Sequence, residues 1–199
     1  MGTRRGVCSR FTFYVSRSNM TPTTEKSTRL VMLRRDLEEI PEFPVPAGFT
    51  LRWYQPGDEA SWLNIHRLAD HYNQITPELF AQQFGNDTLQ LRQRQCFLFD
   101  PSGHAIGTAS AWFDDNFDGG RIGRVHWVAL VPQYQGRKLS KPLMTTICRR
   151  LRELGHERGY LTTIAARKPA IELYLRFGFV PLIRNELDRA IWSEVMQPE

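Results

Sequence analysis

The stretch with the clearest chemical potential is QYQGRKLSKPLM, which runs from Gln133 to Met144. Gly136 permits a backbone angle that other residues avoid, and Pro142 suits the first turn of a helix, where a missing N–H costs nothing. Unpaired backbone N–H groups at the start of a helix attract anions. The stretch therefore has two interpretations, a solvated surface turn or a binding site for a diphosphate.

Side chains in the same stretch add charge to these N–H groups. Arg137, Lys138 and Lys141 are cationic, and Ser140 is a candidate N-cap. The Gly-Lys-Ser/Thr ending of a P-loop is missing, and a single glycine does not make a dinucleotide fingerprint. Any anion site here therefore follows another pattern.

Two regular elements flank this stretch. RIGRVHWVALVP, residues 121–132, is rich in β-formers and predicts a strand that Pro132 ends. Residues 139–154 then place apolar side chains on one helical face, and Gly155 is a plausible helix end. A strand that runs straight into a helix would present the unpaired N–H groups at the loop between them.

The rest of the chain predicts an alternation of strands and helices that points to a mixed α/β sheet. The predicted order is strand, two helices, hairpin, long strand, helix, strand, helix, strand. The elements before and after the long strand are a strand at 49–54, a helix capped by Asp58, a helix at 75–84 with Thr76 as its cap, a hairpin at 94–115, a loop at 115–120, a strand at 160–166, a helix at 169–179 and a strand at 180–183.

VALVPQYQGRKLSKPLM, YLTT and PAIELYLRFGF together resemble the GNAT superfamily of acyl-CoA-dependent N-acetyltransferases. The likeness spans residues 106–182. It implies an α/β (α+β) fold with a mixed, mostly antiparallel central sheet and helices on both faces. It also implies one such domain at residues 29–199, preceded by a basic, flexible extension at residues 1–28.

In that family a Gln/Arg-x-x-Gly-x-Gly/Ala loop holds the pyrophosphate of acetyl-CoA. Gln135 matches the first position, whereas Lys138 and Ser140 replace the two small residues; Lys138 is tolerated there if its φ is negative. A backbone N–H near Leu130 would face the thioester oxygen. The residues that the resemblance assigns to acetyl-CoA are Val128, Leu130, Val131, Gln135, Gly136, Arg137, Lys138, Leu139, Ser140, Lys141 and Arg167.

The block from Ala170 to Phe179 matches the family's Ala-x-x-Leu-Tyr-x-x-x-Gly-Phe pattern. The resemblance makes Tyr174 the general acid that protonates the CoA thiolate, which its ordinary pKa of about 10 allows. Without the resemblance, Tyr174 would be read as a core aromatic residue of an amphipathic helix.

The base that would accept the proton of the amine is open. His126 lies on the central strand, where the family often places a base, and its ordinary pKa is near 6.5. The alternatives are the imidazole of His71 and the carboxylates of Asp70, Asp114, Asp115 and Asp118. Trp112 and Trp127 either wall an acceptor pocket or pack on the sheet.

The predicted activity is direct attack of an amine on the thioester, because Cys148, on the apolar face of a helix, is a poor acyl carrier. The acceptor is a small-molecule amine or a protein amine. A non-catalytic protein that binds CoA or a partner is the alternative, and a nucleic-acid-binding module is a third. A homodimer is possible.

Composition limits the remaining classes. The net charge is +5, but the first 24 residues supply four arginines and no acid, which leaves about +1 for the rest and argues against nucleic acid as a partner. Those first residues could also be a targeting peptide or an over-long start. Three scattered cysteines predict a reducing, cytoplasmic setting. The sequence predicts no metal site and no membrane span.

Overall fold

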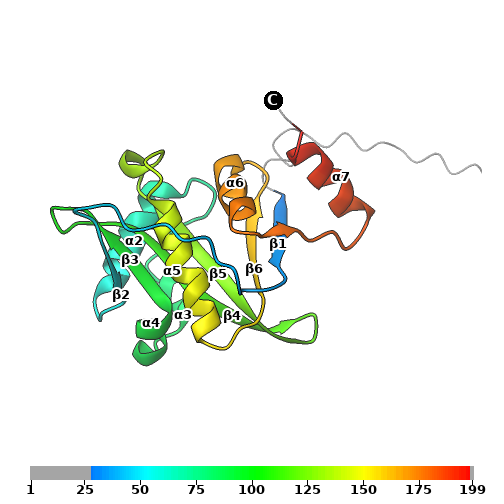
Figure 1. The fold of residues 1–199 in the computed structure, drawn as a ribbon. Coiled ribbons are helices and arrows are strands. Elements are labelled where there is room, and N and C mark those ends of the chain that lie inside the picture. Colours follow the sequence, from blue (N-terminus) through cyan, green and yellow to red (C-terminus); the bar gives the residue numbers. More distant parts are fainter. Residues whose placement is uncertain (1–27, 198–199) are drawn as a thin grey trace, which may run out of the picture.

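The computed structural model describes residues 28–197, which form a seven-stranded sheet with helices on both faces (Figure 1). The strands lie in the order β2-β3-β4-β5-β6-β1-β7. They are β1 (Arg29–Arg34), β2 (Thr50–Trp53), β3 (Gln95–Phe99), β4 (Ala105–Phe117), β5 (Gly120–Leu130), β6 (Gly159–Ile164) and β7 (Val180–Pro181). The helices are α2 (Asp58–Ala69), α3 (Leu79–Phe84), α4 (Thr88–Arg94), α5 (Ser140–Glu153), α6 (Lys168–Arg176) and α7 (Glu186–Val195), with a 3-10 turn, η1 (Pro132–Tyr134).

The sheet is mixed and mostly antiparallel, as predicted. Within the described residues β5 and β6 form the single parallel pair, and their register covers only Gly123↔Gly159 and Arg124↔Tyr160. Beyond Arg124 the two strands continue without pairing, β5 as far as Leu130. The sheet is therefore open between β5 and β6 toward the loop that leads to α5.

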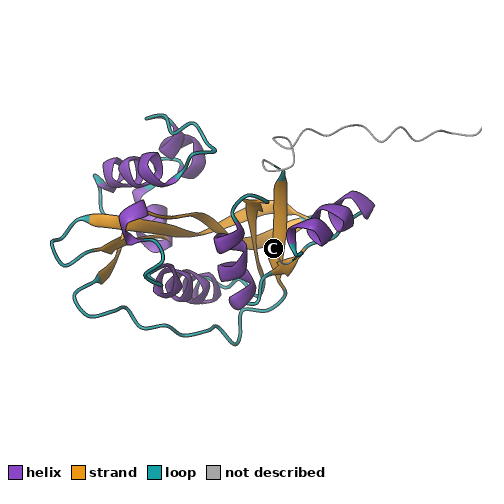
Figure 2. Ribbon diagram, turned by 90° about the horizontal axis from the view of Figure 1, so that it is seen from above, coloured by secondary structure: helices purple, strands orange, loops and turns teal. Residues whose placement is uncertain are grey.

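Helices cover the two faces of the sheet (Figure 2). α2 contacts β4 and β5, and α5 contacts β3, β4 and β5. The apolar face predicted for residues 139–154 is the buried face of α5, where Leu143, Met144 and Ile147 have no exposed surface. Because one face of α5 is buried, its apolar residues repeat every 3.6 positions, and this repeat made the helix easy to predict.

Strand β1 was not predicted. It inserts between β6 and β7, with Leu33 opposite both Tyr160 and Val180. The buried guanidinium of Arg34 donates to the backbone oxygens of Asp36, Glu39 and Phe177, each at 2.6 Å. These contacts link residues up to 143 positions apart, so no local pattern could have indicated them.

Three local predictions were wrong. The helix expected at 75–84 begins only at Leu79, with Glu78 rather than Thr76 at the N-cap. Helix α4 was missed, although Asp87 caps it by accepting the N–H groups of Leu89 and Gln90. The loop expected at 115–120 is largely strand, because β4 runs to Phe117 and turns tightly into β5.

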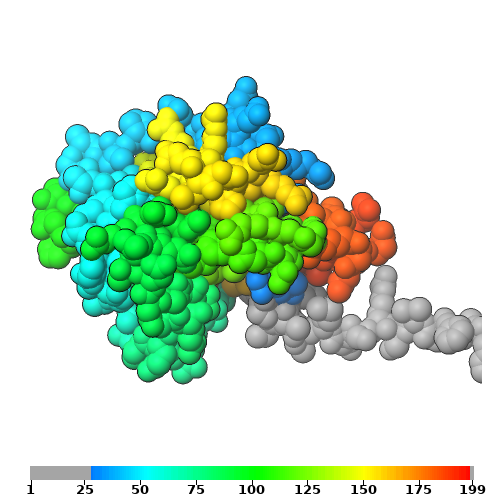
Figure 3. Space-filling model, turned by 90° about the horizontal axis from the view of Figure 1, so that it is seen from below, coloured from blue at the N-terminus to red at the C-terminus, as the bar shows by residue number. Residues whose placement is uncertain are grey.

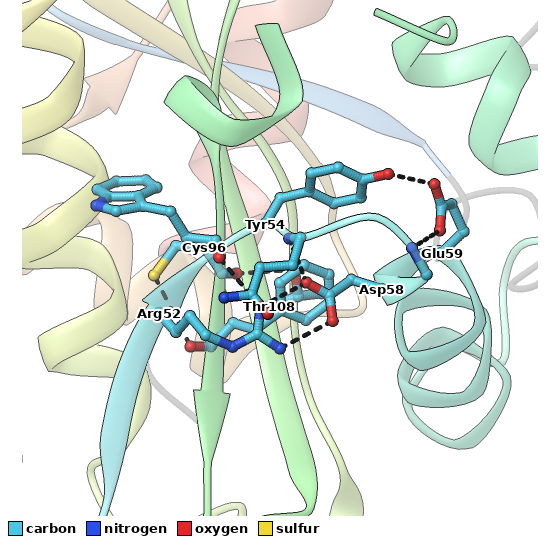
Figure 4. A network of polar contacts seen from close by, with 10 residues as sticks. Arg52, Tyr54, Asp58, Glu59, Cys96 and Thr108 are labelled. Atoms are coloured by element: carbon cyan, nitrogen blue, oxygen red, sulfur yellow. Dashed lines mark hydrogen bonds and ion pairs between the residues drawn. The ribbon is translucent and has the colours of Figure 1, made fainter. Parts of the chain in front are cut away.

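The start of α2 is held by a polar network rather than by the predicted cap (Figure 4). Asp58 is the first helical residue, and Gly57 takes the N-cap position with a φ of 101°. The Asp58 carboxylate accepts the Gln55 N–H at 2.6 Å and two guanidinium nitrogens of Arg52 at 2.7 and 2.9 Å. Tyr54 donates to Glu59 beside this pair. The network ties α2 to β2 and so positions the helix that carries His66 toward β5.

Candidate active site

The loop between β5 and α5 has the geometry of an anion cradle. It passes through η1 and Gly136, whose φ is 74°, and enters α5 at Ser140. Ser140 is the first helical residue rather than the predicted N-cap, which is Leu139. Within residues 28–197 the backbone N–H groups of residues 136–140 have no hydrogen-bond acceptor, whereas Lys141 donates to the Lys138 oxygen at 3.2 Å. Several N–H donors at one helix start are thus available for an anion.

The cations beside these donors are also unpaired. In the described part of the chain Arg137, Lys138, Lys141 and Arg176 make no ion pair with a carboxylate. Partial burial, followed by the charges of Arg176 and Lys138, lowers the pKa of Lys141. Arg137 instead lies over the ring of Tyr134, at 5.0 Å. The loop therefore carries positive charge that no carboxylate of residues 28–197 neutralises.

Lys138 departs from its expected conformation. Its φ is +62°, in the left-handed region, so the condition under which it was expected to be tolerated is not met. A side chain in that region costs about 1–2 kcal/mol, which gives glycine an advantage at this position. The Lys138 side chain is exposed.

Gln135 ties the loop to the end of β5. Its side-chain amide donates to the Leu130 oxygen at 2.8 Å. The Val131 N–H donates to the backbone oxygen of Ile106 on β4 at 2.9 Å. Successive residues of a strand point their backbone groups to opposite sides, so those of Leu130 point away from β4. The Leu130 N–H therefore faces the opening between β5 and β6, as the predicted thioester contact requires.

A bulge bends β5 next to this opening. The register with β4 shifts by one residue between Thr108↔Ala129 and Ser110↔His126. Trp127 occupies the bulge with a φ of +49°, an unusual conformation for a bulky residue. A bulge re-aims the side chains of a strand, and here it turns the Trp127 ring toward α2, where its centroid lies 5.1 Å from that of Trp62.

His126 is a buried, neutral imidazole. Gln83 Oε1 lies 2.9 Å from Trp127 Nε1 and 3.2 Å from His126 Nε2. Because an indole N–H only donates, the Gln83 atom must be an oxygen, and His126 Nε2 must donate to it as well. Burial, followed by the charge of Arg124, lowers the pKa of His126 well below its ordinary value. Its remaining nitrogen, Nδ1, is thus a weak base.

Arg167 and Asp70 pair with each other rather than standing free. Arg167 Nη2 lies 2.7 Å from Asp70 Oδ1, and the guanidinium lies 5.1 Å from the Tyr72 ring centroid. Burial opposes ionisation of Asp70, but hydrogen bonds from Asn73 and Tyr72 and the charge of Arg167 outweigh it and lower its pKa. Asp70 is therefore a stably ionised carboxylate with its oxygens already occupied, a poor proton acceptor.

The other candidate carboxylates lie far from the loop. Asp114 accepts the Tyr160 hydroxyl at 2.7 Å, Asp115 pairs with Arg121 and Asp118 with Arg184. Asp114 is opposite Ile122, eight residues before the end of β5, which is roughly 26 Å of extended strand. Figure 3 shows this end, with the β4–β5 hairpin beside the end of α5. A hollow of about 260 Å³ lies there, lined by Arg94 and residues 154–158 among others, well away from the loop.

Tyr174 is buried on α6, with 8% of its surface exposed. In the described chain no group donates to or accepts from its hydroxyl. Burial raises the pKa of Tyr174 to about 12. The hydroxyl thus stays protonated at neutral pH and has a hydrogen bond to give, which are the two properties that a general acid needs.

Other titratable groups carry no visible role in this chemistry. Cys148 is fully buried, and burial raises the pKa of its thiol to about 12. Burial lowers the pKa of His66 to about 3. Among residues 28–197 no group of three His, Cys, Asp or Glu side chains could hold a metal ion, and no helix is long and apolar enough to cross a membrane.

Three residues near the site were not singled out from the sequence. Gln83 carries no signal, because its role depends on two donors more than 40 residues away. Arg176 ends α6 and was hidden in an apolar helix pattern. Arg124 did give a signal, since a charged residue in the most apolar strand of a chain is unusual.

Comparison with known proteins agrees with this geometry. Residues 62–179 match the acetyltransferase (GNAT) family. Mycothiol acetyltransferases of Thermomonospora curvata and Salinispora tropica are each 32% identical over 75% of this chain and 51% of their own length. The chain thus spans about half the length of these curated relatives.

Solved structures share the fold. The GCN5-related N-acetyltransferase from Sphaerobacter thermophilus aligns with a TM-score of 0.64 at 21% identity, over 77% of this chain and 48% of that one. The ribosomal-protein-S18-alanine N-acetyltransferase from Escherichia coli aligns with a TM-score of 0.55 at 20% identity, over 68% and 79%.

Proposed function

Because this chain belongs to the GNAT family of acetyltransferases, we propose that it transfers the acetyl group of acetyl-CoA directly onto an amine. The observation that carries the proposal is the set of unpaired N–H groups at residues 136–140, with four unpaired cations beside them. A diphosphate satisfies both the donors and the charge. In this proposal the CoA diphosphate lies at the start of α5.

The opening between β5 and β6 would take the pantetheine arm of the coenzyme. Within the described residues the β6 side of Val128 to Leu130 has no strand partner, so this backbone can hydrogen-bond an added strand. Val131 flanks this stretch, and its N–H already bonds to Ile106. The Leu130 N–H then lies along that arm and can donate to the thioester oxygen as negative charge develops on it. Gln135, already bonded to Leu130, keeps the loop and the strand end in register.

Tyr174 would protonate the leaving thiolate. The amine nitrogen attacks the thioester carbon, the carbon–sulfur bond breaks, and the Tyr174 hydroxyl gives its proton to the sulfur. The tyrosinate recovers a proton from solvent, and the amine loses one, so the charges balance. The raised pKa keeps the Tyr174 hydroxyl protonated at neutral pH, so that its proton is in place when the thiolate forms.

The amine must arrive neutral or lose its proton during attack. His126 remains a candidate base through Nδ1, but its lowered pKa makes it a weak one. We therefore assign most of the deprotonation to solvent. For the acceptor, we favour a small-molecule amine over a protein terminus, because the relatives at 32% identity are named for a small molecule, mycothiol.

A non-catalytic protein that binds CoA is the second candidate, and the left-handed Lys138 favours it. Strain in the loop would weaken the cradle without abolishing it. This candidate predicts CoA binding without turnover of any amine.

The test measures thiol release from acetyl-CoA with a panel of amines, for wild type and Tyr174→Phe, alongside CoA affinity by calorimetry. We expect Tyr174→Phe to lower kcat by about 10²- to 10⁴-fold at unchanged CoA affinity. CoA binding without turnover in wild type supports the second candidate. Acetyl label that stays on the enzyme without an acceptor contradicts direct transfer, and absence of CoA binding contradicts both candidates.

A further inference from the structure

Arg124 occupies a special position in the sheet. It is the last residue of β5 that pairs with β6, opposite Tyr160, so it marks the point where the two strands separate. One face of the sheet is filled here, because a Cβ on Gly123 would lie 3.0 Å from the Leu151 side chain of α5. Side chains alternate between the faces along a strand, so Arg124 points to the opposite face from Gly123, as does His126. An acceptor that approaches the opening on that face meets Arg124.

The Arg124 guanidinium has no anionic partner. Within residues 28–197 it makes no ion pair or hydrogen bond, and its Nε is buried without an acceptor. It lies 5.6 Å from the Tyr160 ring centroid. The nearby acid, Asp114, already accepts the Tyr160 hydroxyl. A partly buried charge without a partner is costly, so such a group is expected where a ligand supplies the partner.

A second arginine lies on the same face across β6. Arg29 of β1 is opposite Ile164, and alternation along β1 puts it on the face of Leu33, which is opposite Tyr160. Arg29 is exposed. Burial lowers the pKa of Arg124, and the charge of Arg29 adds to this effect, whereas Tyr160 and Asp114 oppose it without offsetting it.

Resting on the proposed function, we propose that the acceptor amine carries an acidic group, a carboxylate or a phosphate, which binds Arg124 with support from Arg29. The thioester carbonyl is expected at the Leu130 N–H, six residues further along β5, one of which lies in the bulge. The amine and the acidic group would then be roughly 16–20 Å apart. A planar guanidinium binds such a group through two parallel hydrogen bonds, which a lysine could not reproduce.

The experiment uses two matched series of acceptors and the full chain. Straight-chain ω-amino acids of increasing length supply a carboxylate at a varied distance, and ω-amino alcohols of the same lengths lack the charge. We expect longer amino acids to exceed their alcohols by about 10- to 100-fold in kcat/KM. Amino phosphates of matched length then show whether the site prefers phosphate over carboxylate.

Arg124→Gln tests the assignment, and Arg149→Gln is the control. Arg149 is exposed on α5 and pairs with Glu42 at the surface, so its loss removes the same charge elsewhere. We expect Arg124→Gln to abolish the preference for acids by raising the KM of the acids, and Arg149→Gln to keep that preference. If Arg124→Gln does not fold, as judged by its melting curve, Arg124→Lys and Arg29→Gln replace it, and each should reduce the preference.

Two outcomes overturn the inference. The first is equal turnover of acids and alcohols by wild type, and the second is a preference that survives Arg124→Gln. If no amine is acetylated although CoA binds, the proposed function fails separately. The inference is then judged by calorimetry of the N-acetylated acids and alcohols in the presence of CoA, where only the acids should bind, and only with Arg124 intact.

Discussion

The two sides of the site differ in how many of their polar groups the protein already pairs. At the start of α5, the N–H groups of residues 136–140 and the cations beside them are free in the described chain. Across the opening, Asp70 is paired with Arg167, and Gln83 receives two donors. Free charge marks where a ligand supplies the counter-charge, whereas paired groups hold the shape of a pocket.

Arg124 is the exception on the paired side. It is unpaired like the loop cations, yet partly buried like Asp70. In the proposed function, coenzyme binding would depend on polar groups that the described chain leaves unpaired, and acceptor recognition on a set of paired groups with Arg124 as its one unpaired member.

The largest effect is expected from removing charge at the loop. Lys138→Gln combined with Lys141→Gln should weaken CoA binding by about 10- to 100-fold, because both ammonium groups are free to contact phosphate. The salt dependence of binding should decrease as well. Calorimetry at two ionic strengths measures the affinity and its salt dependence. Arg149→Gln is the control, because it also removes a positive charge from the surface. Unchanged affinity would place the diphosphate elsewhere.

A paired group on the acceptor side should affect stability instead. Asp70→Asn removes the partner of Arg167 and weakens four hydrogen bonds to the carboxylate, which should cost about 2 kcal/mol of unfolding free energy. Asp115→Asn breaks an ion pair in which both side chains are 58% exposed, and it should cost less than about 1 kcal/mol. Denaturant melts at pH 7 compare the two. Equal costs would mean that the Asp70 pair holds nothing in place.

The same variant has a pH dependence with a defined sign. The pKa of Asp70 is below its ordinary value of 3.8, so the ionised form stabilises the fold. Its contribution is full above that value and is lost as the pH falls through the lowered pKa. Wild type and Asp70→Asn should therefore differ in melting temperature at neutral pH and converge in acid. A difference that grows in acid contradicts the assigned sign.

A smaller effect is expected at His126. Because its pKa lies far below neutrality and its Nε2 is committed to Gln83, His126→Asn should lower kcat/KM by less than about tenfold, below the usual range for loss of a general base. The pH profile should then follow the acceptor, shifting when an amine of lower pKa is used. A profile fixed by the enzyme and lost in His126→Asn would restore His126 as the base.

The sequence located the loop before α5 better than the polar pairs across the opening, because the signals for the loop are close together in the chain. The loop lies between a strand and a helix that are adjacent in the chain. The apolar patterns of these two elements, together with Gly136 and Pro142, were therefore enough to indicate it. The pairings Asp70–Arg167 and Gln83–Trp127 span 97 and 44 residues. Side-chain partners at such distances follow from the packing of whole elements, which no local pattern contains.

The sequence also contained no sign of backbone conformations that the residue type does not favour. Neither Lys138 nor Trp127 is a residue that favours a positive φ, yet both adopt one. Strand β1 was missed because its pairing partners are the last strands of the sheet. The elements that the sequence indicated well are those whose burial repeats along the chain, above all α5.

The smallest effect is expected from Lys138→Gly, which separates backbone from side chain within the loop. Relief of the left-handed strain, about 1–2 kcal/mol, should exceed the 0.5–1 kcal/mol entropic cost of a glycine, so the variant should be slightly more stable than wild type. Lys138→Ala loses the same ammonium but keeps the strained angle of +62°. Both variants should lose the same electrostatic contribution to CoA binding, and any further difference in affinity between them reports the backbone alone. If Ala and Gly variants melt together, the loop is not strained at Lys138, and the free N–H groups of residues 136–140 owe their arrangement to α5 rather than to this residue.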